Sequence, residues 1–181
     1  MVLLYLISWV LLSPLFTFFH ELGHAGMYQF FTGKKDWHIY IGSGTPVMQF
    51  GRITINKWFV FSGYVTRSEI LLSRWKQVLI SAAGFMVNIL FVILLYNLSW
   101  YLYQWEINMR GSVSSNVINA LYYFQNGVLL IAGFINVLMA LFTMIPTVYP
   151  YGFSDLGGSY SDGLKIFYLF FPPKETDEQS D

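Results

Sequence analysis

The amino-acid sequence predicts a membrane protein of the α-helical class, with about three core transmembrane helices and a small β-strand region between the first and second. The 181 residues are 55% hydrophobic and 11% charged, whereas a soluble domain usually carries about 25% charged residues. Three long apolar segments each exceed the roughly 20 residues that a membrane-spanning helix needs. The stretch between the first two is instead rich in β-branched and aromatic residues interrupted by glycine, which is typical of short strands.

The first span is expected at about residues 2–31, since positions 2–19 are almost entirely apolar. Pro14 falls inside it and is expected to kink or open the helix locally, which a bundle tolerates when neighbouring groups satisfy the freed carbonyl. The segment has neither a basic n-region nor a small-residue cleavage site. We therefore interpret it as a retained span and not as a signal peptide.

Residues 37–68 form the predicted strand region. Short strands are expected at 38–41, 47–50, 52–55 and 58–61, separated by turns that contain glycine or polar residues. His38 lies in the first of these strands without a partner at metal-ligand spacing, so we interpret it as structural. Strands of this kind also offer an edge to which an extended peptide can add.

The second and third spans are expected at about residues 71–98 and 117–145, with a polar loop at 106–116 between them. Each carries a buried amide, Asn88 in the second span and Asn136 in the third, and an amide at this depth needs a partner. Asn88 either makes an interhelical hydrogen bond worth roughly 0.6–2 kcal/mol or holds a substrate backbone beside a site. We expect residues 1–171 to form one domain and residues 172–181 to form a charged C-terminal tail.

Basic residues predict the orientation of the spans. Most of them lie between the first and second spans, whereas the loop between the second and third has only Arg110. By the positive-inside rule the first of these segments is cytoplasmic. This predicts a multi-pass protein of the cell membrane, in contact with the lipid bilayer, with its N-terminus outside and its C-terminus in the cytoplasm. The net charge of zero gives no indication of a nucleic-acid partner, and the lack of cysteine excludes disulfides and cysteine-ligated zinc.

One short motif near the end of the first span indicates chemistry. His20 and His24 are four residues apart, so on a helix both imidazoles face the same side and can reach one metal ion. Glu21 stands next to the first histidine, where it can take a proton from a water that the metal activates. This is the H-E-x-x-H pattern of zinc metalloproteases. Ionisable groups are costly inside a membrane, so their presence there points to function.

A third ligand is needed, because catalytic zinc typically has three protein ligands and one open position for water. Asp155 and Asp162 both follow the third span. In the predicted topology they return to the same side of the membrane as His20 and His24. Spacing and topology leave both aspartates open as the third ligand.

These motifs resemble the site-2 protease family of intramembrane zinc metalloproteases. The resemblance covers four elements: a first-helix motif, the strand region after it, a G-x-x-x-N element, and a helix followed by an aspartate-glycine motif. The residues that resemble them are, in order, Phe19 to Ala25, Trp58 to Val65, Gly84 with Asn88, and Asn136 with Met144-Ile145-Pro146 and Ser161-Asp162-Gly163.

The resemblance implies a role for each residue of the site. Glu21 would be the general base, and His20, His24 and Asp162 would hold one Zn²⁺ per chain, with Asp155 as the alternative third ligand. The two buried amides, Asn88 and Asn136, would support the substrate or the transition state.

The implied function is an intramembrane zinc endopeptidase that hydrolyses a peptide bond within or near a transmembrane segment. Its substrate would be a membrane protein or a precursor peptide, selected by the membrane core, the strand region or a regulatory partner protein. Two alternatives stay open: an inactive relative that binds membrane helices, and a membrane protein that handles metal ions. The intact Glu21 argues against the first, and the few polar groups in the second and third spans argue against the second.

Overall fold

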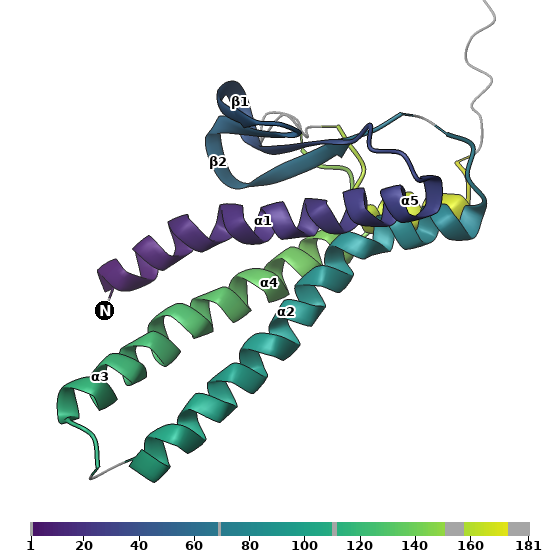
Figure 1. The fold of residues 1–181 in the computed structure, drawn as a ribbon. Coiled ribbons are helices and arrows are strands. Elements are labelled where there is room, and N and C mark those ends of the chain that lie inside the picture. The colour runs from purple at the N-terminus through teal and green to yellow at the C-terminus, as the bar shows by residue number, and fades with distance from the viewer. Residues whose placement is uncertain (1, 69, 110–111, 151–157, 174–181) are drawn as a thin grey trace, which may run out of the picture.

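The computed structural model describes residues 2–68, 70–109, 112–150 and 158–173. Three long helical segments cross one another, and a sheet lies against one of them (Figure 1). In chain order the elements are α1 (Val2–Thr32), β1 (His38–Phe50), β2 (Ile53–Thr66), α2 (Arg74–Met109), α3 (Ser115–Tyr123), the π-helical turn η1 (Phe124–Leu129), α4 (Leu130–Met144) and α5 (Asp162–Phe170). The expected class, helical with a strand region between the first two spans, is confirmed.

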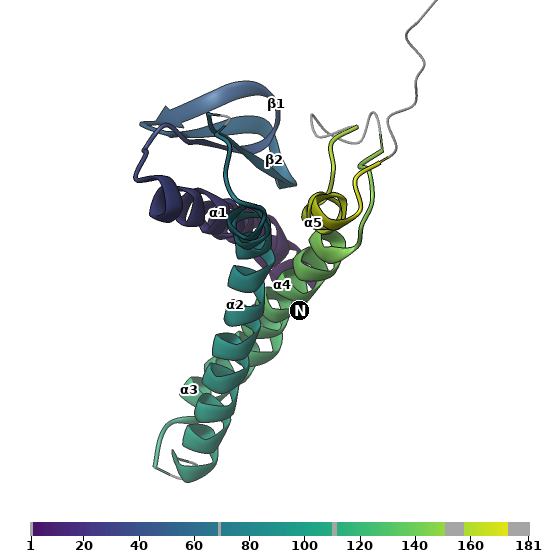
Figure 2. The same cartoon turned by 90° about the vertical axis from the view of Figure 1, so that its right-hand side faces the viewer.

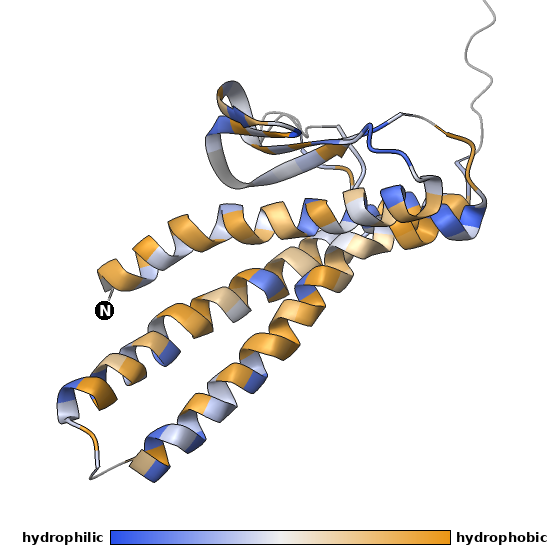
Figure 3. Ribbon diagram, in the orientation of Figure 1, coloured by the Kyte–Doolittle hydropathy of each residue, from blue (hydrophilic) through white to orange (hydrophobic). Residues whose placement is uncertain are grey.

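Three helical segments are long and apolar enough to cross a membrane: α1, α2, and the continuous run from α3 through η1 to α4. Most residues along these segments are hydrophobic (Figure 3). Leu6, Leu11 and Ile93 are each about half exposed or more, at 60%, 65% and 53%. Exposed apolar surface on this scale would favour aggregation in water, whereas it suits contact with lipid.

The helix that contains the second predicted span extends beyond the loop start expected from the sequence. α2 has 36 residues, which at 1.5 Å per residue makes it about 54 Å long, well beyond the roughly 30 Å of membrane hydrocarbon. The predicted polar loop at 106–116 is therefore wrong for its first residues, because the helix continues to Met109 and Glu106 is buried. The aromatic residues at 100–105 continue the helix, since interfacial side chains do not interrupt its backbone.

Small residues allow α1 and α2 to approach closely near the metal motif. A Cβ atom on Gly23 would lie 2.8 Å from the carbonyl oxygen of Ala83, so only glycine fits at this crossing. Nearer the N-terminus of α1, Phe16 packs with Ala132 and Ile135 of α4. Its ring contacts that of Phe91 edge to face, with the ring centroids 5.1 Å apart. α1 remains helical through Pro14, so the local opening expected there does not break the element.

The sheet consists of two long antiparallel strands joined at Gly51, whose positive φ of 55° suits glycine. Apart from Arg52, which lies in the turn, the four short strands expected from the sequence fall within these two elements. β1 and β2 continue through several register shifts without ending. Ile39 partners both Val65 and Ile53, so the start of β1 lies between two parts of β2. The sheet packs on α1 through a small core of Ala25, Ile39 and Ile41.

The last described helix, α5, lies beside the start of α2 and the end of α4 (Figure 2). An antiparallel bridge between Val148 and Tyr160 closes the segment that leads into it. This closure brings the first residue of α5, Asp162, to the level of the histidine motif on α1. The alternative ligand Asp155 and most of the predicted tail, residues 174–181, lie outside the described residues.

Candidate metal centre

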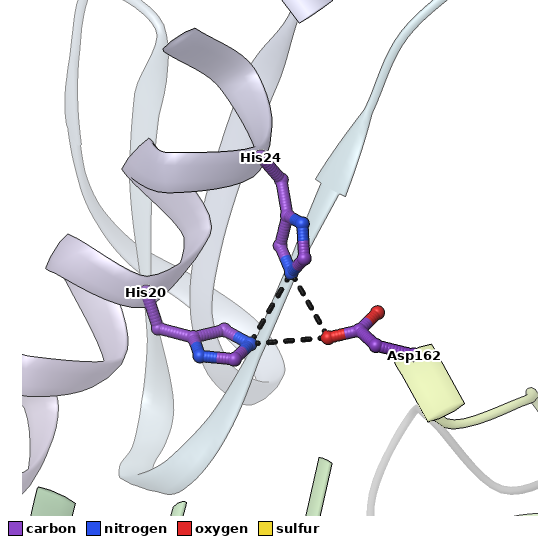
Figure 4. A group of neighbouring side chains, drawn as sticks. All are labelled: His20, His24 and Asp162. Carbon is purple, nitrogen blue, oxygen red and sulfur yellow. Dashed lines mark hydrogen bonds and ion pairs between the residues drawn. The ribbon is translucent and has the colours of Figure 1, made fainter. Parts of the chain in front are cut away.

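The two histidines of the H-E-x-x-H motif face the same side of α1 and meet Asp162 from α5 (Figure 4). The Nε2 atoms of His20 and His24 are 3.2 Å apart. Asp162 Oδ2 lies 3.3 Å from His20 Nε2 and 3.0 Å from His24 Nε2. The helical spacing therefore brings the two imidazoles together as predicted, and the third predicted side chain closes the triangle.

The dimensions of this triangle suit a metal ion. A tetrahedral zinc site with ligand distances of about 2.0–2.1 Å separates its ligand atoms by about 3.3 Å, close to the 3.0–3.3 Å edges found here. Two imidazole nitrogens and a carboxylate oxygen are a donor set that zinc takes. All three side chains are buried. This group could therefore hold a metal ion.

Each histidine has a partner for its other ring nitrogen. His24 Nδ1 lies 2.6 Å from the carbonyl oxygen of Ile80, so the Nδ1–H donates there and the Nε2 lone pair is free for a ligand bond. His20 Nδ1 lies 3.0 Å from Asn88 Nδ2, while the fully buried Asn88 Oδ1 has no hydrogen-bond partner among the described residues. Turning the amide by 180° lets Oδ1 accept from His20 Nδ1–H and frees Nε2 in the same way.

α2 also leaves the space that an ion would need. A Cβ atom on Gly84 would collide with the Nε2 atoms of both His20 and His24. Gly84 and Asn88, expected from the sequence to share one face of α2, thus both contact the histidine pair. The sequence did not reveal this contact, because it depends on the register between α1 and α2.

Ser161 fixes the position of the aspartate. Its Oγ donates to the carbonyl oxygen of Ile145 at 2.8 Å and accepts from the backbone N–H groups of Thr147 at 3.0 Å and Leu164 at 3.2 Å. It is the N-cap of α5 and is 1% exposed. Sequence reasoning named Ser161 only as part of a motif, although a serine before the first helical residue is a standard N-cap signal.

Gly163 completes this attachment, because a Cβ atom there would overlap the carbonyl group of Met144 at the end of α4. The start of α5 therefore packs directly against the end of α4. This close approach gives a packing reason for the glycine of the aspartate-glycine pair.

The carboxyl group of Asp162 is ionised in this setting. Burial by itself would raise the pKa of Asp162, but its interactions with the His20 and His24 imidazoles, with a smaller effect from the charge of Lys165, hold it well below its usual range. An ionised carboxylate is the form that binds a metal ion.

A cavity of about 1320 Å³ opens onto this group. Glu21, which is buried, lines it together with His20, His24 and Asp162. The remaining wall is largely apolar or aromatic, and α4 and β2 contribute Ile135, Leu138, Met139, Phe142, Trp58 and Val65 to it. The cavity thus combines one cluster of ionisable residues with a largely apolar wall, which is typical of ligand-binding clefts.

Tyr149 also lines this cavity. Burial, followed by the nearby charges of Asp162 and Glu21, raises the pKa of Tyr149 to about 12. Its hydroxyl group therefore stays protonated at neutral pH and can donate a hydrogen bond. The irregular segment around Tyr149 gave no signal in the sequence that would single this residue out.

The other predicted residues are placed as follows. Asn136 is fully buried and donates to the carbonyl oxygen of Ala132 in its own helix, and neither it nor Asn88 is among the residues that line the cavity. Support of a substrate by these two amides stays a prediction. His38 bonds to Thr54 Oγ1 at 2.8 Å, which fits the structural interpretation.

Comparisons of the chain with protein-family models, with curated proteins and with solved structures found no match in any of the three. The description of the site therefore rests on the sequence and structure of this protein. The main observations are three helices able to span a membrane and a buried group of two histidines and one aspartate that could hold a metal ion.

Proposed function

We propose that the protein is an intramembrane zinc endopeptidase of the site-2 protease type. The observation that supports this most is the convergence of Asp162 with His20 and His24 at metal-ligand spacing, beside the buried Glu21 in one cavity. A histidine pair alone would suit many metal-binding proteins. The adjacent glutamate and the cavity are what a hydrolytic site needs in addition.

In the proposed mechanism His20, His24 and Asp162 hold one Zn²⁺ and Glu21 handles the proton. Zinc bound there would polarise the scissile carbonyl and lower the pKa of a water molecule toward about 7. Glu21 accepts the proton from the attacking water and delivers it to the nitrogen of the leaving amine. The protonated Tyr149 hydroxyl supplies a further hydrogen-bond donor on the cavity wall.

The largely apolar lining of the cavity favours an apolar peptide as substrate. The α4 wall presents Ile135, Leu138 and Phe142, and β2 presents Trp58 and Val65 on another side. A peptide bond inside a helix is shielded by its neighbours, so a transmembrane substrate must unwind locally before it is cut. Strand addition to the sheet would hold the unwound segment. The proposed substrate is thus a membrane protein or a precursor peptide. A partner protein would regulate the protease.

The proposed orientation follows from the basic residues between α1 and α2. They would lie on the cytoplasmic side of the cell membrane, with the N-terminus outside and the C-terminus in the cytoplasm. The site would then lie in the cytoplasmic half of the membrane and admit water from that side.

The experiment combines metal content with cleavage in detergent-solubilised full-length protein. Wild type, Asp162→Ala and Asp155→Ala are assayed for zinc and for cleavage of a panel of single-span substrates, with products identified by mass spectrometry. The proposal expects about one zinc per chain in wild type, cleavage that a chelator stops and zinc restores, and loss of both properties in Asp162→Ala. Zinc binding without cleavage of any substrate would favour the metal-handling or helix-binding alternative instead. Loss of zinc only in Asp155→Ala would show that Asp155, and not Asp162, is the third ligand.

A further inference from the structure

The two oxygens of the Asp162 carboxylate face different partners. Oδ2 points to the imidazoles, 3.3 Å from His20 Nε2 and 3.0 Å from His24 Nε2. Oδ1 accepts a hydrogen bond from Lys165 Nζ at 3.1 Å. Lys165 follows Asp162 by three residues, so both side chains lie on the same face of α5. One carboxylate oxygen thus faces the candidate metal position, and the other binds the ammonium group of Lys165.

We propose that Lys165 is a positioning residue that keeps Oδ1 away from the metal, so that Asp162 binds through Oδ2 alone. This inference rests on the proposed zinc site. One carboxylate oxygen and two Nε2 atoms make three protein ligand atoms, which leaves a fourth position for water. Released from Lys165, the same carboxylate can turn and bind through both oxygens, which would crowd that position.

The other contacts at the start of α5 do not determine which carboxylate oxygen of Asp162 faces the metal position. Ser161 and Gly163 fix the backbone at the start of α5 through contacts with the end of α4. These contacts do not involve either oxygen of the Asp162 carboxylate. Lys165 restricts rotation of the carboxylate because its ammonium group binds Oδ1 with the strength of a charge-assisted hydrogen bond.

A simpler interpretation is that the pair only stabilises the N-terminal turn of α5. Ion pairs at this spacing do so on exposed helices, where water screens them. Here the side chain of Asp162 is 7% exposed and that of Lys165 is 51% exposed. Lys165 also lines the cavity that contains Glu21. The acid is therefore buried at the site, and the lysine reaches it from the cavity wall.

The test measures metal binding in full-length protein, with Lys165→Met, Lys165→Arg and the control Lys34→Met. Lys34 is exposed at the end of α1 and does not line the cavity. Zinc affinity is measured by chelator competition, and the visible spectrum of the Co²⁺-substituted protein reports the coordination number. We expect Lys165→Met to weaken zinc binding about 10-fold, as for other residues that orient a ligand, and to weaken the d–d bands as four-coordinate cobalt becomes five-coordinate. Lys165→Arg should keep most of the affinity, and Lys34→Met all of it.

Wild-type affinity and an unchanged cobalt spectrum in Lys165→Met would overturn the inference and leave only the helix-stabilising pair. Equal losses in Lys165→Arg and Lys165→Met would overturn it too, because the charge would then not matter. A wild type that binds no metal defeats both this inference and the proposed function. A wild type that binds zinc, shows the expected Lys165 effects and cleaves nothing would defeat the protease proposal alone.

Discussion

The two halves of the candidate site are built in different ways. On α1, helical geometry alone puts His20 and His24 on one face, with Glu21 beside them. On α5, Asp162 arrives from another helix, and its place depends on contacts between the end of α4 and the start of α5. The α1 half therefore depends on local helix geometry, and the α5 half depends on tertiary contacts. Changes around α1 should affect the space beside the histidines and the orientation of their rings. Changes around α5 should affect the position of the Asp162 carboxylate.

The largest expected effect comes from filling the space between α2 and the histidines. Gly84→Val would place side-chain atoms where the Nε2 atoms of His20 and His24 converge, so zinc binding should fall below detection. Gly26→Val is the matched control on α1, because a Cβ atom there meets nothing within 4 Å. Zinc per chain is measured by mass spectrometry, with circular dichroism to check folding. Retained zinc in a folded Gly84→Val protein would contradict the position inferred for the ion.

The next effect concerns ring orientation in the α1 half. Asn88→Ala removes the amide that faces His20 Nδ1 and should weaken zinc binding about 10- to 100-fold. Asn136→Ala removes an amide that is equally buried but bonds within its own helix, so its zinc affinity should stay near that of wild type. Chelator competition measures both variants. Equal effects of the two changes would remove the distinction between an orienting amide and a packing amide.

A smaller effect is expected in the α5 half. Ser161→Ala loses the side-chain hydrogen bonds to Ile145, Thr147 and Leu164, and should destabilise the protein by about 1–3 kcal/mol while weakening zinc binding roughly 10-fold. Ser114→Ala is the control, since Ser114 is an N-cap whose side chain makes no cap hydrogen bond. Thermal unfolding with and without zinc separates the two effects. If Ser161→Ala and Ser114→Ala behave alike, the α5 half does not depend on this attachment.

The same distinction explains what the sequence could predict of the fold. Apolar length and composition predicted three long apolar helical segments and a strand region, and these are confirmed. The ends of elements were predicted less well. α2 runs to Met109, and four expected strands merge into two, because local residue preferences do not determine where packing lets an element continue.

For the site, helical spacing was enough to predict that His20 and His24 lie together. The motif resemblance pointed to Asp162, which lies beside them, whereas spacing and topology also left Asp155 open. The contacts that Gly84 and Asn88 make with the histidines were not predictable from the sequence. They depend on how α1 and α2 pack, and no periodicity within one helix encodes that register.

The most direct test of the central proposal is the effect of Glu21→Gln on cleavage at matched zinc content. The glutamine keeps the shape of Glu21 but cannot accept a proton, and Glu21 is not one of the three ligand residues. We predict that Glu21→Gln keeps the zinc content of wild type and loses cleavage of a single-span substrate that wild type cuts. Cleavage at the wild-type rate by Glu21→Gln, with zinc bound, would contradict the proposed role of this site.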